Sequence, residues 1–313
     1  MARLISVPGL ASLLIVSTAR EIDDLIDHPR LDRAFVGEGR LVNRFLVAGL
    51  LRQTRHRGET LDAFRPRDDD GRRERQRTLF ARLDRLSELD RWPSAPVAEM
   101  ARYVVDGRHR KAARAALAFA VTGPFLNQEQ LPSDDAYQPF GRRLWRLHRR
   151  TARARSPLSP VGMAYRLLGV DRRARAAILG LVNGDAYGLH AVEITLANAD
   201  AILERMRVAM RDGVTGTFLS PSELSWAAIR TAPEVVVRQS ENAETTLPHV
   251  SARVPPRTLV LLQMRAGLKA DAASGYEFAS AHWSACPARR YVMGLFAAVA
   301  RTAVDLARGG ERR

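Results

Sequence analysis

The chain has 313 residues, of which 46% are hydrophobic and 6% aromatic, and it carries a formal net charge of +15. This length allows one large domain or two modest ones, each with a sizeable core. The single cysteine, Cys286, excludes an internal disulfide framework and fits a reducing cytoplasm. No uninterrupted apolar stretch reaches the roughly 18 residues of a membrane span, and the sequence predicts no signal peptide. We therefore expect a cytoplasmic protein.

Arginine carries almost all of the positive charge, since the only lysines are Lys111 and Lys269. Such an excess favours acidic partners, namely nucleic acid, anionic lipid or an acidic protein. A GC-rich genome that encodes surface cations as arginine explains the excess about equally well. The arginines are scattered, and neither a zinc-finger spacing nor an RNA-binding aromatic signature accompanies them, so nucleic acid is not the expected partner.

Hydrophobic periodicity predicts a mostly helical chain with a few strands near its beginning and late in its course. Strands are expected over residues 13–18 and 235–238, and a turn into a further strand over 253–262. Polar or small-residue connections are expected over 54–70, 122–139 and 267–275. Helices are expected over 19–27, 41–53, 72–83, 97–105, 108–121, 140–155, 164–168, 173–181, 189–210, 220–230 and 291–306.

Two arginines of the predicted helix 72–83 are candidates for binding an anion. Arg73 and Arg77 are four residues apart and so share one face of the helix. Such a pair could clamp a carboxylate or a phosphate. The alternative is a solvated basic face that forms salt bridges with the preceding acids at 68–70.

A threonine stands among apolar residues in the middle of the predicted long helix. Thr195 follows Ala191-Val192-Glu193-Ile194. A buried threonine hydroxyl commonly bonds back to its own helix. That structural explanation competes with a chemical role.

The only cysteine lies just before the predicted last helix. The N–H groups and the positive end of a helix favour the thiolate form of a nearby cysteine. The Cys286 thiolate could attack a substrate, or it could bind a soft metal or a haem iron. The alternative is a buried cysteine that fills space.

Taken in order, these features resemble the cytochrome P-450 family of haem-thiolate proteins. The matches follow the family's order along the chain: residues 14–18 and 27–31 resemble the first strand and the helix ending in D-P-R-L; 70–81 the H-x-x-x-R helix; 191–195 A-G-x-[DE]-T; 227–238 E-x-x-R with its later arginine; 254–262 I-P-x-G-T-x-V; and 278–288 F-G-x-G-x-H-x-C-P-G.

The chain also departs from the family pattern. Arg73 replaces the histidine of H-x-x-x-R, and Ala227 replaces the glutamate of E-x-x-R, with Glu223 one turn earlier. Ile194 stands where the acid before the threonine is expected, and Glu193 is offset by one. The loop before Cys286 has one extra residue and lacks the family's glycines, and the whole chain is shorter than a typical bacterial member.

The resemblance implies a mainly α, shortened cytochrome P-450-like fold with small β-sheets, forming a single haem-binding domain over 1–313. It implies haem b with Cys286 as the axial thiolate that ligates the iron. Thr195 and Glu193 correspond to the oxygen-activating pair. The residues that correspond to contacts with the haem carboxylates are Arg73, Arg77, Arg238 and His282.

The function implied is a monooxygenase that oxidises a small-molecule secondary metabolite, with an acidic ferredoxin docked on a basic face. One alternative is a haem-thiolate peroxygenase or dehydratase that needs no redox partner. Another is a haem-free relative that serves as a helper protein for a glycosyltransferase. The substrate and the oligomeric state stay open.

Overall fold

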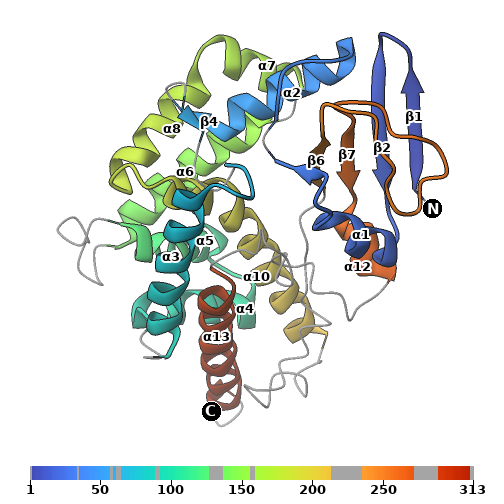
Figure 1. Ribbon diagram of the computed structural model, residues 1–313. Helices are drawn as coiled ribbons and strands as arrows, with labels where there is room; N and C mark the ends of the chain where they lie inside the picture. Colours follow the sequence, from blue (N-terminus) through green and yellow to red (C-terminus); the bar gives the residue numbers. More distant parts are fainter. Residues whose placement is uncertain are drawn as a thin grey trace. The chain divides into compact units, whose positions relative to one another are not determined.

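The computed structural model describes residues 2–33, 35–56, 59–60, 65–88, 92–126, 137–155, 159–212, 235–270 and 288–310 (Figure 1). The chain divides into two compact units, one formed by 1–77 with 231–286 and the other by 78–230 with 287–313. We call them the sheet unit and the helical unit. Helix α3 (Asp70–Glu88) contains the boundary between them. The single domain expected from the sequence stays a prediction.

The sheet unit is built on a five-stranded mixed sheet in the order β1-β2-β7-β6-β3. Strands β2 and β7 are parallel, with Leu13 opposite Leu259, and the other neighbouring pairs are antiparallel. The strands are β1 (Arg3–Val7), β2 (Ala11–Val16), β3 (Leu31–Asp32), β6 (Val236–Ser240) and β7 (Leu259–Leu262). The three predicted strands are confirmed. Strand β1 was not predicted, because Pro8 and Gly9 suggested a break; they form the turn of the β1–β2 hairpin, where Gly9 has a φ of 68°.

Helices α1 (Ala19–Ile26) and α12 (Met264–Ala270) pack together in the core of the sheet unit. Their apolar side chains join those of the central strands in one buried cluster that includes Leu14, Ile22 and Val260. Helix α12 corrects the predicted loop at 267–275 as far as Ala270. Its first residue, Met264, is fully buried in this cluster, and packing of this kind can override the low helix propensity of the small residues that follow.

Helix α2 (Leu41–Thr54) is fixed to the sheet by one buried asparagine. Both groups of the Asn43 amide bond the backbone of Ser12, at 2.8 and 2.7 Å, and Nδ2 also donates to Arg257 O at 3.0 Å. After α2, β4 (Arg55–His56) and β5 (Glu59–Thr60) form a short hairpin inside the predicted loop 54–70.

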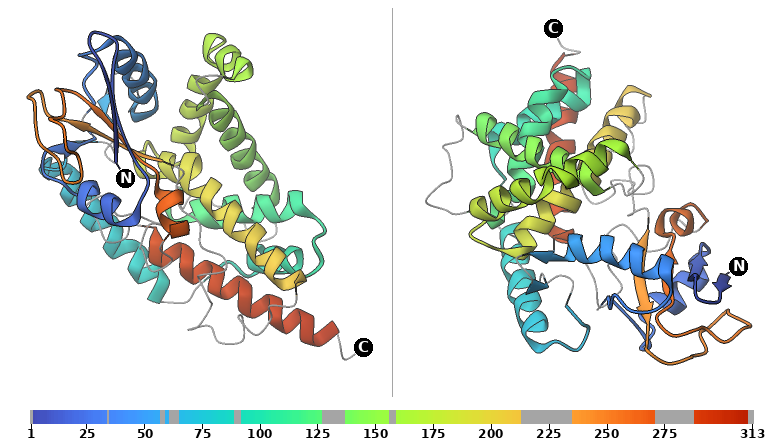
Figure 2. Two further views of the ribbon diagram at one scale, coloured as in Figure 1. Left: turned by 90° about the vertical axis from the view of Figure 1, so that its right-hand side faces the viewer. Right: turned by 90° about the horizontal axis from the view of Figure 1, so that it is seen from above.

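The helical unit confirms the predicted helices that fall on its described residues. It contains α4 (Ser94–Asp106), α5 (Arg110–Thr122), the 3-10 turn η2 (Gly123–Phe125), α6 (Tyr137–Arg155), α7 (Pro160–Leu167), α8 (Val170–Leu181), α9 (Ala186–His190), η5 (Ala191–Thr195), α10 (Leu196–Arg211) and α13 (Arg289–Gly310). The predicted helix 220–230 lies outside the described residues. Figure 2 shows α13 as the long red helix ending near the C-terminus.

Close packing and ion pairs hold these helices together. The backbones of α5 and α6 approach so closely at Gly141 that a Cβ there would lie 2.1 Å from Ala115 O. Arg114 of α5 forms a bidentate pair with Asp200 of α10, at 2.9 and 2.7 Å. Tyr103 of α4 donates to Glu204 of α10 at 2.6 Å. These contacts fix α10 against α4 and α5.

The described residues form neither a membrane span nor a metal-binding cluster. None of the helices in this part of the chain is long and apolar enough to cross a membrane. None of its histidines, cysteines, aspartates and glutamates gather in a group of three or more that could hold a metal ion.

Candidate functional site

The long helix predicted over 189–210 is confirmed and contains a π-helical turn. Helix α9, the π turn η5 and α10 run without a break from Ala186 to Arg211. Asp185 caps the start, where its carboxylate accepts from Tyr187 N at 2.7 Å. π turns are rare and occur frequently at functional sites. This one coincides with the sequence motif that carries Thr195.

The hydroxyl of Thr195 differs from those of other threonines in the helical unit. Thr122 and Thr302 donate to the carbonyl four residues earlier, at 2.6 and 3.0 Å, and Thr151 donates to His148 O at 2.9 Å. Thr195 is only 5% exposed, yet its hydroxyl forms no hydrogen bond with any described residue. The bond back to its own helix, which would have given it a purely structural role, is therefore not seen.

Glu193, the second residue predicted for catalysis, is engaged in a buried ion pair. It is 7% exposed, and its Oε1 lies 3.1 Å from Nε of Arg175 on α8. Residues two apart on a helix do not face each other, so the pairing directs Glu193 toward α8. The carboxylate balances a buried cation there.

A histidine from α6 bonds the backbone of the π turn. His148 is 6% exposed, and its Nδ1 lies 2.7 Å from Val192 O. A carbonyl can only accept, so Nδ1 carries the proton in this bond. Sequence reasoning missed His148, although it follows buried Leu144 and Leu147 at helical spacing on the inward face of a very basic helix.

Arg238, predicted to meet a carboxylate of the cofactor, is a buried cation in the sheet unit. It is 2% exposed and donates from Nε to Ile26 O at 3.3 Å. Burial lowers its pKa to about 10, although the charges of Asp27 and Asp32 act in the opposite direction. The nearby charge of Arg72 lowers the pKa further. The surroundings of Arg238 therefore still disfavour its charge.

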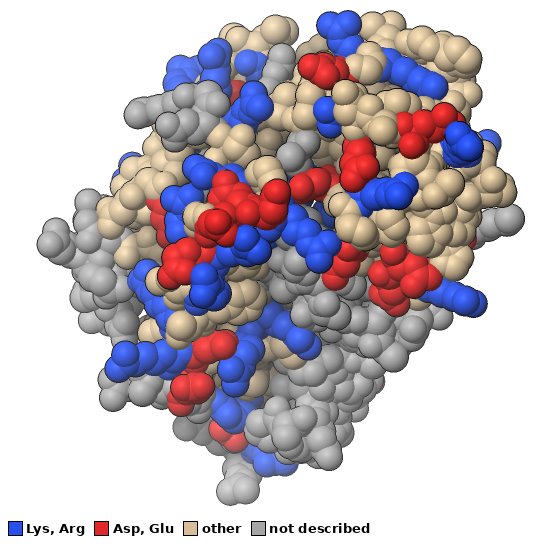
Figure 3. Space-filling model, viewed as in Figure 1, with Lys and Arg blue, Asp and Glu red and all other residues tan. Residues whose placement is uncertain are grey.

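Helix α3 directs a different arginine inward from the two that the sequence suggested. Arg73 and Arg77 have side chains 56% and 76% exposed, and they pair with Asp70 and Glu74 of the same helix. This is the solvated, salt-bridged face considered as the alternative, and in Figure 3 red and blue atoms lie side by side along α3. Arg72, one position earlier, is 3% exposed and donates to Gln76 Oε1 at 3.2 Å.

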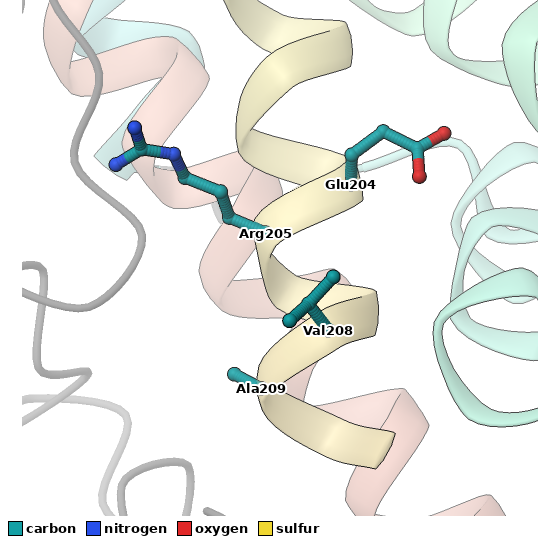
Figure 4. A pocket seen from close by; sticks show the side chains of 4 residues that line it. All are labelled: Glu204, Arg205, Val208 and Ala209. Atoms are coloured by element: carbon teal, nitrogen blue, oxygen red, sulfur yellow. The ribbon is translucent and has the colours of Figure 1, made fainter. Parts of the chain in front are cut away.

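The remaining predicted site residues, Cys286 and His282, lie outside the described residues, as does the motif around Ala227. The structure confirms only that a helix, α13, begins at Arg289, shortly after the cysteine in the sequence. A shallow hollow on α10 is lined by Glu204, Arg205, Val208 and Ala209, whose side chains leave the helix in different directions (Figure 4). Because Glu204 already bonds Tyr103, this hollow is not a second candidate site.

The order of these elements, with the π turn inside the long helix, is that of the cytochrome P450 fold, and solved structures of that kind match 96% of the chain. Cytochrome P450SP alpha (CYP152B1), determined in complex with (R)-ibuprophen, matches with a TM-score of 0.61 and 14% identity over 84% of its own chain. A cytochrome P450 from Thermus thermophilus gives 0.56 and 14% over 85%. CYP105N1 from Streptomyces coelicolor A3(2) gives 0.54 and 12% over 84%.

At these identities the likeness shows the fold alone, and it confirms the mainly α, cytochrome P450-like fold predicted from the sequence. No protein-family model matches the chain, and no curated protein matches it either.

Proposed function

We propose that this chain is a haem-thiolate enzyme of the cytochrome P450 kind that oxidises a small molecule. The observation that carries the proposal is Thr195, which ends a π turn and whose hydroxyl is not bonded back to its helix. In a chain with this fold, the same residue also ends the segment that resembles the oxygen-activating motif. The two arguments are independent, because one rests on geometry and the other on sequence.

The buried cations of the sheet unit suit the cofactor that this function requires. Haem b carries two carboxylates, and arginine binds carboxylates with strong, charge-assisted hydrogen bonds. Arg238 is buried where its charge is disfavoured, so an added anion would relieve it. We infer that Arg238 and the inward-facing Arg72 would bind these carboxylates more readily than the exposed Arg73 and Arg77. His282 stays a predicted contact.

In this proposal Cys286 supplies the axial thiolate. A haem iron with such a ligand supplies oxygen activation, with the thiolate favouring cleavage of the O–O bond. Thr195 Oγ1 would hold a proton and pass it toward the reacting group. The bond from His148 to Val192 would keep the π turn, and with it Thr195, in position.

The finer parts of the function are also proposals. The substrate class that we infer is a small secondary metabolite, and the compartment is the cytoplasm. An acidic ferredoxin would deliver electrons by docking on a basic face, since complementary charge speeds association.

One observation favours a second candidate, a peroxide-driven enzyme that needs no redox partner. Glu193, the only acid of the motif, is engaged by Arg175 and is poorly placed to deliver protons to Thr195. A reaction that starts from hydrogen peroxide already contains the two electrons and two protons that oxygen would need. Turnover with peroxide alone would favour this candidate, and turnover only with reduced ferredoxin would favour the first.

The experiment that tests the haem-thiolate proposal is an absorption spectrum of the protein, reduced and saturated with carbon monoxide. We expect a Soret band strongly shifted to the red in the wild type and in Thr195→Val, and its loss in Cys286→Ser. A band unchanged in Cys286→Ser would exclude this cysteine as the ligand. Protein that stays colourless after haem is supplied would favour the haem-free helper, which should then copurify with a glycosyltransferase.

A further inference from the structure

Helix α7 has the reverse of the polarity expected for a surface helix. A helix on the surface of a protein normally turns its polar residues to water. In α7 the exposed large side chains are apolar: Val161 is 52% exposed, Met163 49% and Leu167 81%. Leu168, directly after the helix, is 68% exposed. The only charged residue of α7, Arg166, is turned inward and donates to Ala154 O at 2.7 Å.

The segment around α7 is also the most basic part of the chain. Residues 137–181 contain eleven arginines, no lysine and one acid, Asp171, and so carry a net charge of +10 out of the chain's +15. Four arginines of α6 recur at helical spacing and are all exposed: Arg146, Arg149, Arg150 and Arg153. None of these four forms an ion pair with a described residue, whereas the exposed arginines of α3 do.

The basic and apolar side chains form one continuous surface. Arg153 of α6 donates to the Tyr165 hydroxyl of α7 at 3.1 Å. Arg173 of α8 donates to Leu168 O at 2.8 Å. Helix α7 packs against both α6 and α8, and in Figure 1 and the left view of Figure 2 it lies at an outer end of the helical unit.

We propose that this surface binds an anionic lipid membrane, with the apolar residues of α7 inserted among the acyl chains and the arginines on the headgroups. Apolar residues flanked by arginine are the composition of helices that lie in a membrane interface. Each arginine near an anionic surface strengthens binding about fivefold. A second copy of the chain is disfavoured as the occupant, because two faces of net charge +10 repel each other. The proposal does not depend on the presence of haem.

The test is flotation of the full chain with vesicles of phosphatidylcholine alone or with phosphatidylserine added. We expect binding only to the anionic vesicles. Leu167→Ser/Leu168→Ser should weaken it at least about tenfold, because two leucines lose their apolar environment. Arg149→Gln/Arg150→Gln should weaken it about 30-fold. The matched control is Arg102→Gln/Arg290→Gln, which removes two exposed arginines that pair with Glu99 and Asp84 in the same unit; its binding should fall several-fold less.

Three results would overturn the proposal. The first is an absence of binding to anionic vesicles. The second is binding that the leucine variant leaves unchanged, since this would leave a purely electrostatic patch of the kind that docks an acidic protein. The third is a dimer without lipid that the leucine variant dissociates, because a second copy would then cover α7. Circular dichroism checks that the variants are folded.

Discussion

Two buried charges in this molecule are balanced in different ways. In the helical unit, Glu193 and Arg175 form an ion pair with both side chains about nine-tenths buried. In the sheet unit, Arg238 is more deeply buried, and its surroundings lower its pKa to about 10 despite Asp27 and Asp32. The first charge is neutralised within the fold. The second gains from a further anion, which makes Arg238 the better indicator of a binding site.

Removing one partner of the neutralised pair should have the largest effect on stability. Glu193→Gln leaves the Arg175 charge buried without its counterion, and we expect a loss of about 3 kcal/mol in the free energy of unfolding. Urea denaturation measures it. The matched control is the double variant Glu193→Gln/Arg175→Met, which should regain most of the loss. If the single variant were as stable as the wild type but inactive, Glu193 would be catalytic rather than structural.

Removing the other charge should act on haem instead. Arg238→Met should leave the haem-free protein as stable as the wild type or more so, because a disfavoured charge is gone. It should weaken haem binding about 10- to 100-fold, the effect of about 1.5–3 kcal/mol for a hydrogen bond to a charged group. Haem titration and urea denaturation separate the two effects.

Arg238→Lys is the control for Arg238→Met, since it keeps the charge and should retain part of the haem affinity. Haem affinity equal to the wild type in Arg238→Met, combined with a large loss of stability, would contradict the comparison. Arg238 would then be a structural residue like Arg175.

The same contrast explains which site residues could be predicted from the sequence. Helix periodicity located the long helix and Thr195 correctly, because the motif and the apolar spacing agree. The direction of a charged side chain is less predictable: Arg72, Arg73 and Arg77 occur in one basic run, and only tertiary packing decides which of them turns inward. His148 could not be assigned, because its partner is a backbone carbonyl that becomes available only where the helix is π-helical.

A neutral buried group should have an intermediate effect. His148→Phe leaves Val192 O buried without its donor, and we expect a loss of about 1–2 kcal/mol in the free energy of unfolding. His148→Asn can place an N–H close to the position of Nδ1 and should recover part of it. If the haem proposal holds, His148→Phe should also shift the spectrum of bound haem while Cys286 stays ligated, because the π turn carries Thr195.

The smallest effect is expected at Glu204, whose charge is balanced but partly exposed. Burial alone raises its pKa, but hydrogen bonds from Tyr103 and Arg207 and the charge of Arg110 outweigh burial, so the pKa lies below the usual 4.5. The folded state therefore binds its proton less readily than the unfolded state. The resulting stability is present above about pH 4.5 and is lost as the pH falls through the lower folded value.

Solvent screens this pair, so we expect only a few tenths of a kcal/mol. Urea denaturation from about pH 6 to about pH 3 should show a slightly shallower acid limb in Glu204→Gln than in the wild type. A change as large as that of Glu193→Gln would mean that α10 depends on its surface contacts with α4 and α5 as much as on its buried ion pair.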